Sequence, residues 1–273
     1  MKATVIVDNI KNGDIKGEWG LSLLIEYNGK IILLDTGASY LFADNASKLG
    51  LDLEDVDIAV LSHAHYDHAN GFGKFFELNN KAKLYVRDCC AENCYGKKWI
   101  FHKYIGIPKG VFSKYKDRIE YVSGDYKICE GISLLSHKTE GLEKIGKREN
   151  LYQKKNRKLT PDDFSHEQSL VFDTEEGLVV FNSCSHAGVA NIIKEVETVY
   201  PSKKVIAIIG GFHLFRRKDE EVRELAKQIK NTGIKYVYTG HCTGQRAYDV
   251  LKVELGDMVK QLKVGLEINI GER

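Results

Sequence analysis

The chain has 273 residues and a formal net charge of +2, enough length for one large α/β domain. Its apolar fraction of 43% is typical of a globular protein, and no apolar run reaches the roughly 18 residues that a membrane span needs. The small charge gives no reason to expect a membrane or nucleic-acid partner. An acidic residue at Asp8 comes too early for a signal peptide, so we expect a cytoplasmic protein whose cysteines are free thiols, or metal or redox groups.

The first part of the chain predicts strands and one helix. An Asn28-Gly29 pair between two apolar runs indicates a tight hairpin, because both turn positions favour positive φ. Gly50 stands where a glycine commonly ends a helix. The predicted elements are strands at 3–7, 21–27, 30–34 and 58–61 and a helix at 40–49.

The last third of the chain predicts strands alternating with helices, a pattern typical of layered α/β folds. The predicted strands are 169–172, 178–181, 205–209 and 236–238, and the predicted helices are 189–199, 220–231 and 247–255.

The middle third fits this alternation less well. Strands are predicted at 83–86, 119–122 and 132–135, whereas residues 138–165 are polar and basic. We therefore expect one domain over 1–273 with an inserted α+β subdomain at about 80–160, for which a ferredoxin-like arrangement is one candidate, followed by a mobile basic loop.

The most informative segment is Ser62-His63-Ala64-His65-Tyr66-Asp67-His68, which directly follows the apolar strand at 58–61. Three imidazoles and a carboxylate this close together are typical ligands of zinc, iron or manganese. His63 and His65 share one side of an extended segment and could bind one ion, while Asp67 and His68 could bind a second beside it. Two adjacent ions can hold an attacking hydroxide and polarise a substrate oxygen.

The chain resembles the metallo-β-lactamase superfamily in several motifs. His63, His65, Asp67 and His68 match its His-x-His-x-Asp-His signature. Further matches are Asp35-Thr36-Gly37 after a strand and the Gly240-His241 pair. The segments 184–188 (Cys-Ser-His-Ala-Gly) and 240–244 (Gly-His-Cys-Thr-Gly) resemble one branch, some members of which are linked to pterin or ribofuranosyl-aminobenzene phosphate chemistry. The resemblance covers about residues 3–270 and implies a four-layer αββα sandwich with metals at one edge.

The resemblance also implies a ligand set for two divalent ions, zinc first, with manganese or iron as alternatives. We expect one ion at His63, His65 and His186, and the other at Asp67, His68 and His241. Many family members carry a bridging Asp after the strand equivalent to 178–181, but this chain has Asn182-Ser183-Cys184-Ser185-His186 there. Cys184 or His186 must replace it, or hydroxide bridges alone.

Other residues have predicted supporting roles. Asp35 is expected to orient a metal-binding histidine through its second ring nitrogen. His213 is a candidate proton donor, oxyanion stabiliser or further ligand, and Asp67 is expected to orient the hydroxide and move a proton. His166 and Glu18 could face the same cavity. We expect packing or surface roles for His102 and His137 and for the cysteines at 89, 90 and 94.

These features predict a dinuclear metal-dependent hydrolase. Its expected substrate is a small anionic molecule, a phosphodiester or a phosphorylated compound, because basic residues at 144–158 would suit it. The alternatives are a non-catalytic ligand-binding or regulatory protein that keeps a metal site, and a pterin-pathway transferase. RNA is the less favoured substrate, and a homo-oligomer remains open.

Overall fold

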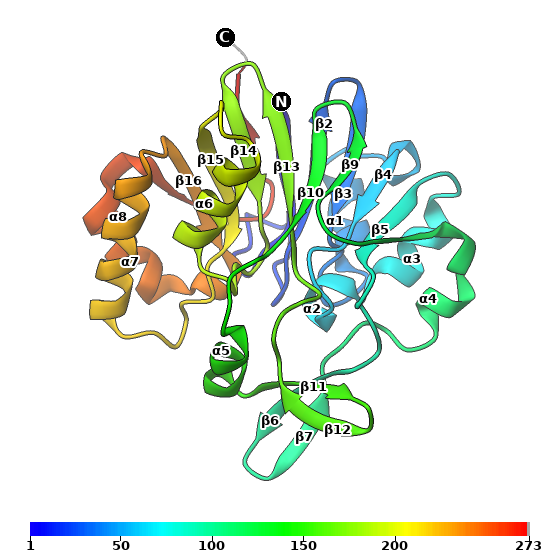
Figure 1. The fold of residues 1–273 in the computed structure, drawn as a ribbon. Helices are drawn as coiled ribbons and strands as arrows, with labels where there is room; N and C mark the ends of the chain where they lie inside the picture. The colour runs from blue at the N-terminus through cyan, green and yellow to red at the C-terminus, as the bar shows by residue number, and fades with distance from the viewer. Residues whose placement is uncertain (272–273) are drawn as a thin grey trace.

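The computed structural model describes residues 1–271, and its centre is a pair of stacked seven-stranded sheets (Figure 1). The first sheet has the order β18-β1-β2-β3-β4-β5-β8. Its strands are β1 (Lys2–Val7), β2 (Ser22–Tyr27), β3 (Lys30–Leu34), β4 (Ile58–Val60), β5 (Lys83–Arg87), β8 (Ile119–Val122) and β18 (Glu267–Asn269).

The second sheet has the order β17-β16-β15-β14-β13-β10-β9. Its strands β14 to β17 are parallel, and β9, β10 and β13 add antiparallel pairs. The strands are β9 (Tyr126–Cys129), β10 (Ile132–Ser136), β13 (Gln168–Thr174), β14 (Gly177–Phe181), β15 (Val205–Gly211), β16 (Tyr236–Gly240) and β17 (Val259–Gln261).

Helices cover the outer face of each sheet, so the molecule has four layers (Figure 1). One outer layer holds α1 (Leu41–Lys48), α3 (Phe72–Leu78) and α4 (Val111–Lys114), and the other holds α6 (Val189–Val199), α7 (Asp219–Thr232) and α8 (Gln245–Leu255). Three apolar cores result, one between the sheets and one under each helical layer. The predicted αββα sandwich is confirmed.

The segment expected to be an insertion is divided among three sheets. Strands β5 and β8 belong to the first large sheet, and β9 and β10 to the second, because their apolar side chains complete the main cores. Only four strands form a separate small sheet, of order β12-β11-β6-β7. They are β6 (Cys94–Lys98), β7 (Phe101–Tyr104), β11 (Leu151–Lys155) and β12 (Lys158–Pro161).

The small sheet corrects two details of the sequence prediction. It consists of two hairpins with no helix between the strands of either, which differs from a ferredoxin-like order. The basic stretch at 138–165 is not a loop, since it forms α5 (Leu142–Glu149) and the β11–β12 hairpin. Leu142 packs into the core under α6, α7 and α8 and anchors α5. The many basic residues of this stretch hid that helix from the sequence prediction.

Within residues 1–271, none of the helices combines the length and the apolar character required to span a bilayer.

The core between the sheets should dominate stability. Phe172 is fully buried there, and its ring contacts Phe181 and Tyr27 at centroid distances of 5.5 and 5.2 Å. We expect Phe172→Ala to lower the free energy of unfolding by about 3–5 kcal/mol, since it leaves a cavity. Val253→Ala, at a side chain 83% exposed, should change it by less than about 0.5 kcal/mol. Urea unfolding of both variants measures this, and equal midpoints would contradict the packing.

Candidate metal centre

The candidate site lies where strands from both large sheets end at one edge of the sandwich. Asp35 follows β3, and the segment 62–68 follows β4 and begins the short helix α2 (Tyr66–Ala69). From the second sheet, the segment 182–186 follows β14, His213 follows β15, and His241 follows β16. A rigid scaffold therefore presents these loops to one another. In Figure 1, α2 marks this edge, next to the small sheet.

A buried carboxylate joins these loops. Asp35 Oδ1 accepts the backbone N–H of Ser62 at 2.7 Å. Its Oδ2 accepts the Ser62 hydroxyl at 2.6 Å, the Ser183 hydroxyl at 2.6 Å and Nδ1–H of His68 at 2.8 Å. Since Ser183 follows β14 of the second sheet, Asp35 joins segments from both sheets at the site, and it orients the ring of His68.

Four of the histidines have their Nδ1 atom next to an oxygen. His68 Nδ1 contacts Asp35, and His63 Nδ1 lies 2.9 Å from the Ser62 hydroxyl oxygen. His186 Nδ1 makes a very short contact with Glu167, and His241 Nδ1 lies 3.3 Å from Asn9 Oδ1. In the neutral form of each ring, these contacts place the proton on Nδ1 and leave the Nε2 lone pair available to a metal ion.

The Nε2 atoms of His63, His65, His186 and His241 are buried and have no hydrogen-bond partner. An unpartnered buried polar atom is costly, so four ring nitrogens gathered in one place fit the ligands of a metal ion. Burial lowers the pKa of all four imidazoles, that of His63 well below its usual range and that of His186 to about 4. At neutral pH they are uncharged, the state that binds metal.

The geometry brings together the first predicted ligand set. One ring nitrogen each of His63, His65 and His186 can be chosen so that all lie within 4.8 Å of one another. This set of three histidines, with its unpartnered ring nitrogens, fits a metal ion with imidazole ligands.

The second predicted set surrounds the Asp67 carboxylate. Asp67 Oδ2 lies 3.8 Å from His68 Nε2 and 3.5 Å from His241 Nε2. Burial lowers the pKa of His68, but the charges of Asp67 and Asp35 outweigh it and raise the pKa to about 9. The two carboxylates thus favour a positive charge at His68. In the metal-free protein a proton on the ring supplies this charge, and a bound metal ion would take the place of that proton.

A second buried polar cluster adjoins the site and shares His65 with it. It contains Cys94, Asp162 and His166. His166 Nδ1 accepts the backbone N–H of Ala64 at 3.1 Å, and its Nε2 lies 3.2 Å from Asp162 Oδ2. Both ring nitrogens of His166 therefore have partners, unlike those of the candidate ligands. His166 holds the backbone of Ala64, between two candidate ligands, and does not line the cleft that the sequence suggested.

His213 lies at the edge of the site. Its ring centroid is 4.7 Å from that of His186, its Nδ1 is buried without a partner, and its backbone N–H donates to Cys242 Sγ at 3.2 Å. Burial lowers its pKa, but the neighbouring Cys242 and Glu149 outweigh this and raise it. His213 is thus placed to hold a proton next to the candidate ligands.

Backbone conformation at the site is unusual. Positive φ occurs at Asp35 (59°), Ser185 (52°), His213 (49°) and His241 (46°), all in the strand-exit loops. Such non-glycine conformations persist only where the surrounding structure enforces them, and they gather at functional sites. Gly210 permits the close approach of two of these loops, since a Cβ there would lie 1.9 Å from Asn182 O.

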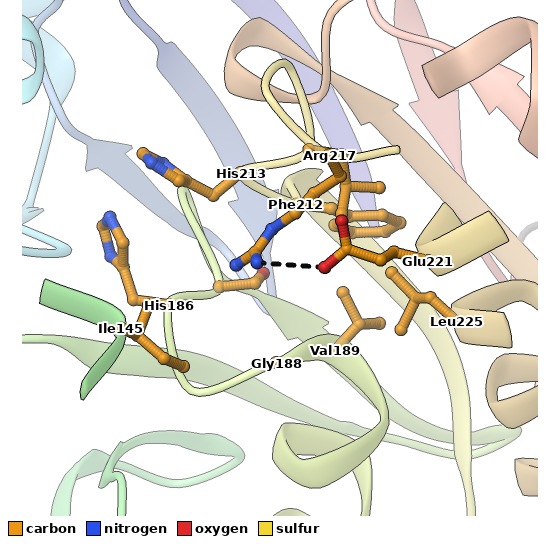
Figure 2. Close-up of a pocket in the computed structure, with 11 residues that line it drawn as sticks. Ile145, His186, Gly188, Val189, Phe212, His213, Arg217, Glu221 and Leu225 are labelled. Carbon is orange, nitrogen blue, oxygen red and sulfur yellow. Dashed lines mark hydrogen bonds and ion pairs between the residues drawn. The ribbon is translucent and has the colours of Figure 1, made fainter. Parts of the chain in front are cut away.

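Two hollows meet at His186 and His213. One, shown in Figure 2, is lined on its far side by the Arg217–Glu221 ion pair and by apolar residues from α5, α6 and α7. The other is the open cleft over the candidate ligands. Its rim carries Trp19, Phe215, Arg216 and, from the small sheet, Lys97. The cleft therefore combines aromatic faces with positive charge.

Several supporting residues escaped sequence reasoning. Glu167 and Ser183 were visible beside predicted residues, but their roles depend on contacts across the fold. Asn9 lies 232 positions from His241, and nothing in the sequence connects them. His137 is a packing residue as expected, held by Glu195 and Asn182, and His102 is exposed. Glu18 instead caps the loop at 38–39 and does not line the cleft.

Comparison with known proteins identifies the family. A model of the metallo-β-lactamase superfamily matches residues 20–140. A Methanocaldococcus jannaschii protein named 7,8-dihydropterin-6-methyl-4-(β-D-ribofuranosyl)-aminobenzene-5′-phosphate synthase is 31% identical, over 95% of this chain and 96% of its own. The crystal structure of Tm1679, a metal-dependent hydrolase of the β-lactamase superfamily, matches with a TM-score of 0.83 and 28% identity over 100% of both chains. The chain belongs to the metallo-β-lactamase superfamily.

A second relative from the same organism, the uncharacterised protein MJ0448, is 26% identical over 89% of this chain and 91% of its own. The resemblance to a pterin-linked branch is confirmed by the name of the first relative. Members of the superfamily typically bind divalent metals such as zinc.

The contact between Glu167 and His186 can be tested without knowing the substrate. We expect Glu167→Gln to weaken zinc binding by about 10- to 100-fold, because a neutral acceptor holds Nδ1–H of His186 less firmly. Competition with a chromophoric chelator measures the affinity. Glu130→Gln, at a side chain 92% exposed, is the matched control. Unchanged affinity in Glu167→Gln would contradict the orienting role.

Proposed function

We propose that this protein is a dinuclear metal-dependent hydrolase that acts on a small phosphorylated molecule. The observation that carries the proposal is the set of four buried, unpartnered Nε2 atoms beside a carboxylate. His63, His65 and His186 would hold one ion, and Asp67, His68 and His241 the other. Bound metals of this kind supply a hydroxide at neutral pH and polarise a substrate oxygen.

The protein's own residues would perform the remaining tasks. Asp67, which lies 3.5 Å from His241 Nε2 and lines the cleft, would orient the attacking water and take its proton. His213, which lines the same cleft, would give a proton to the leaving group, in keeping with its raised pKa.

The cleft rim supports an anionic substrate with a flat ring. Lys97 and Arg216 are exposed there and would bind a phosphate. Trp19 and Phe215 pack edge to face at 5.4 Å, and Trp19 also approaches His241 at 5.1 Å. An aromatic group of the substrate would stack against Trp19, next to the candidate ligand His241.

The second candidate function is a synthase of the pterin type. It is favoured by the name of the 31% identical relative, whose product carries a pterin, an aminobenzene and a phosphate. The aromatic and cationic rim would suit such a molecule as well. The two candidates separate in one assay: a hydrolase releases product from a phosphodiester alone, whereas a synthase of this type would need a dihydropterin and a ribofuranosyl-aminobenzene phosphate together.

Loss of a ligand should remove metal and activity together. We expect His65→Ala to bind at least one metal ion fewer per chain and to lose turnover of a generic phosphodiester at pH 7–8. His102→Ala removes an exposed histidine outside the site and should keep both. Elemental analysis and the same assay on both variants measure this. Two ions per chain in His65→Ala would reject the ligand assignment.

The rim charge should affect binding more than chemistry. We expect Arg216→Ala to raise KM for a phosphorylated aromatic substrate by about tenfold, the loss of one charge-assisted hydrogen bond, with kcat little changed. Arg223→Ala, on the outer helix α7, is the matched control. Steady-state kinetics measure both parameters. A fall in kcat with constant KM would mean that Arg216 does not bind the ground-state phosphate.

A further inference from the structure

The Cys184 thiol lies between the two candidate ligand sets. It follows β14, is 3% exposed, and its Sγ is 3.4 Å from His68 Nε2. It shares one compact cluster with His63 and His68, and another with His186 and His213, each with ligand atoms within 4.8 Å of one another. Cys184 thus reaches histidines assigned to both metals.

We infer that Cys184 is a thiolate ligand that bridges the two metal ions, in place of the aspartate that this chain lacks at the end of β14. The inference rests on the proposed metal binding. A further observation is that the Nε2 atoms of His63 and His186 are buried without a hydrogen-bond partner, and each of these two histidines shares a compact cluster with Cys184. When a metal binds, the Cys184 S–H bond breaks, the sulfur keeps the electron pair and the proton passes to solvent.

The neighbouring Cys242 has a different role. Its Sγ accepts the backbone N–H of His213 at 3.2 Å and lies 3.5 Å from Cys184 Sγ. A Cβ on Gly211 would lie 2.6 Å from this sulfur, so the glycine makes room for it. Cys242 is a positioning residue: its sulfur holds the backbone of His213 and packs against Cys184 Sγ.

A sulfur ligand has a consequence for metal choice. Thiolate favours zinc, cobalt and iron over magnesium and manganese, which prefer oxygen. The wild type, with Cys184 at the bridge, should therefore bind zinc over manganese with a larger ratio of affinities than the Cys184→Asp variant.

Spectroscopy of the cobalt-loaded protein tests the inference directly. The wild type, titrated with Co²⁺, should gain a near-ultraviolet thiolate-to-cobalt charge-transfer band as it binds two ions. Cys184→Ser and Cys184→Asp should lose that band, and Cys184→Asp should still bind two ions. Cys242→Ser, the matched control, should keep it. X-ray absorption of the zinc-loaded wild type should show one sulfur neighbour per zinc at about 2.3 Å.

The outcomes separate this inference from the proposed function. Two bound ions with no sulfur neighbour in the wild type would overturn the bridging role and leave the metal sites standing. A band that persists in Cys184→Ser but disappears in Cys242→Ser would overturn it in favour of Cys242. If the wild type binds no metal, both proposals fail. The wild-type measurements decide even if a variant does not fold.

Discussion

The site depends on one buried carboxylate. Asp35 accepts four hydrogen bonds, from Ser62, His68 and Ser183, which lie in the segments that follow β4 of the first sheet and β14 of the second. A buried carboxylate needs such partners, because an unpaired charge in the interior is very costly. The two sheets must meet at this edge for Asp35 to obtain its hydrogen-bond donors. In return, Asp35 holds the loops after the strands in positions where the histidines converge.

The same logic extends to the other imidazoles. Ser62, Glu167 and Asn9 fix the Nδ1 side of His63, His186 and His241, as Asp35 does for His68. Each oxygen determines which nitrogen keeps its lone pair, so the orientation of the ring is settled before any metal arrives. Preorganisation of this kind explains why so many buried polar groups, costly in isolation, are gathered at one edge of the sandwich.

Local sequence predicted the elements with strong periodicity and the ligands in short motifs. The helix expected at 189–199 coincides with α6, and the strands before His63 and His241 are present. The small sheet could not be predicted, because Lys-rich strands such as β11 and β12 lack an alternating apolar face and pair only through contacts distant in sequence. The partners Glu167 and Asn9 escaped for the same reason: their roles exist only across the fold.

The central claim is that preorganised imidazoles hold two metal ions at this edge. The most direct measurement is anomalous X-ray diffraction from crystals grown with zinc. The account predicts two peaks, one within bonding distance of His63, His65 and His186, and one within bonding distance of Asp67, His68 and His241. A single peak at Cys94, Asp162 and His166, or none at this edge, would contradict it.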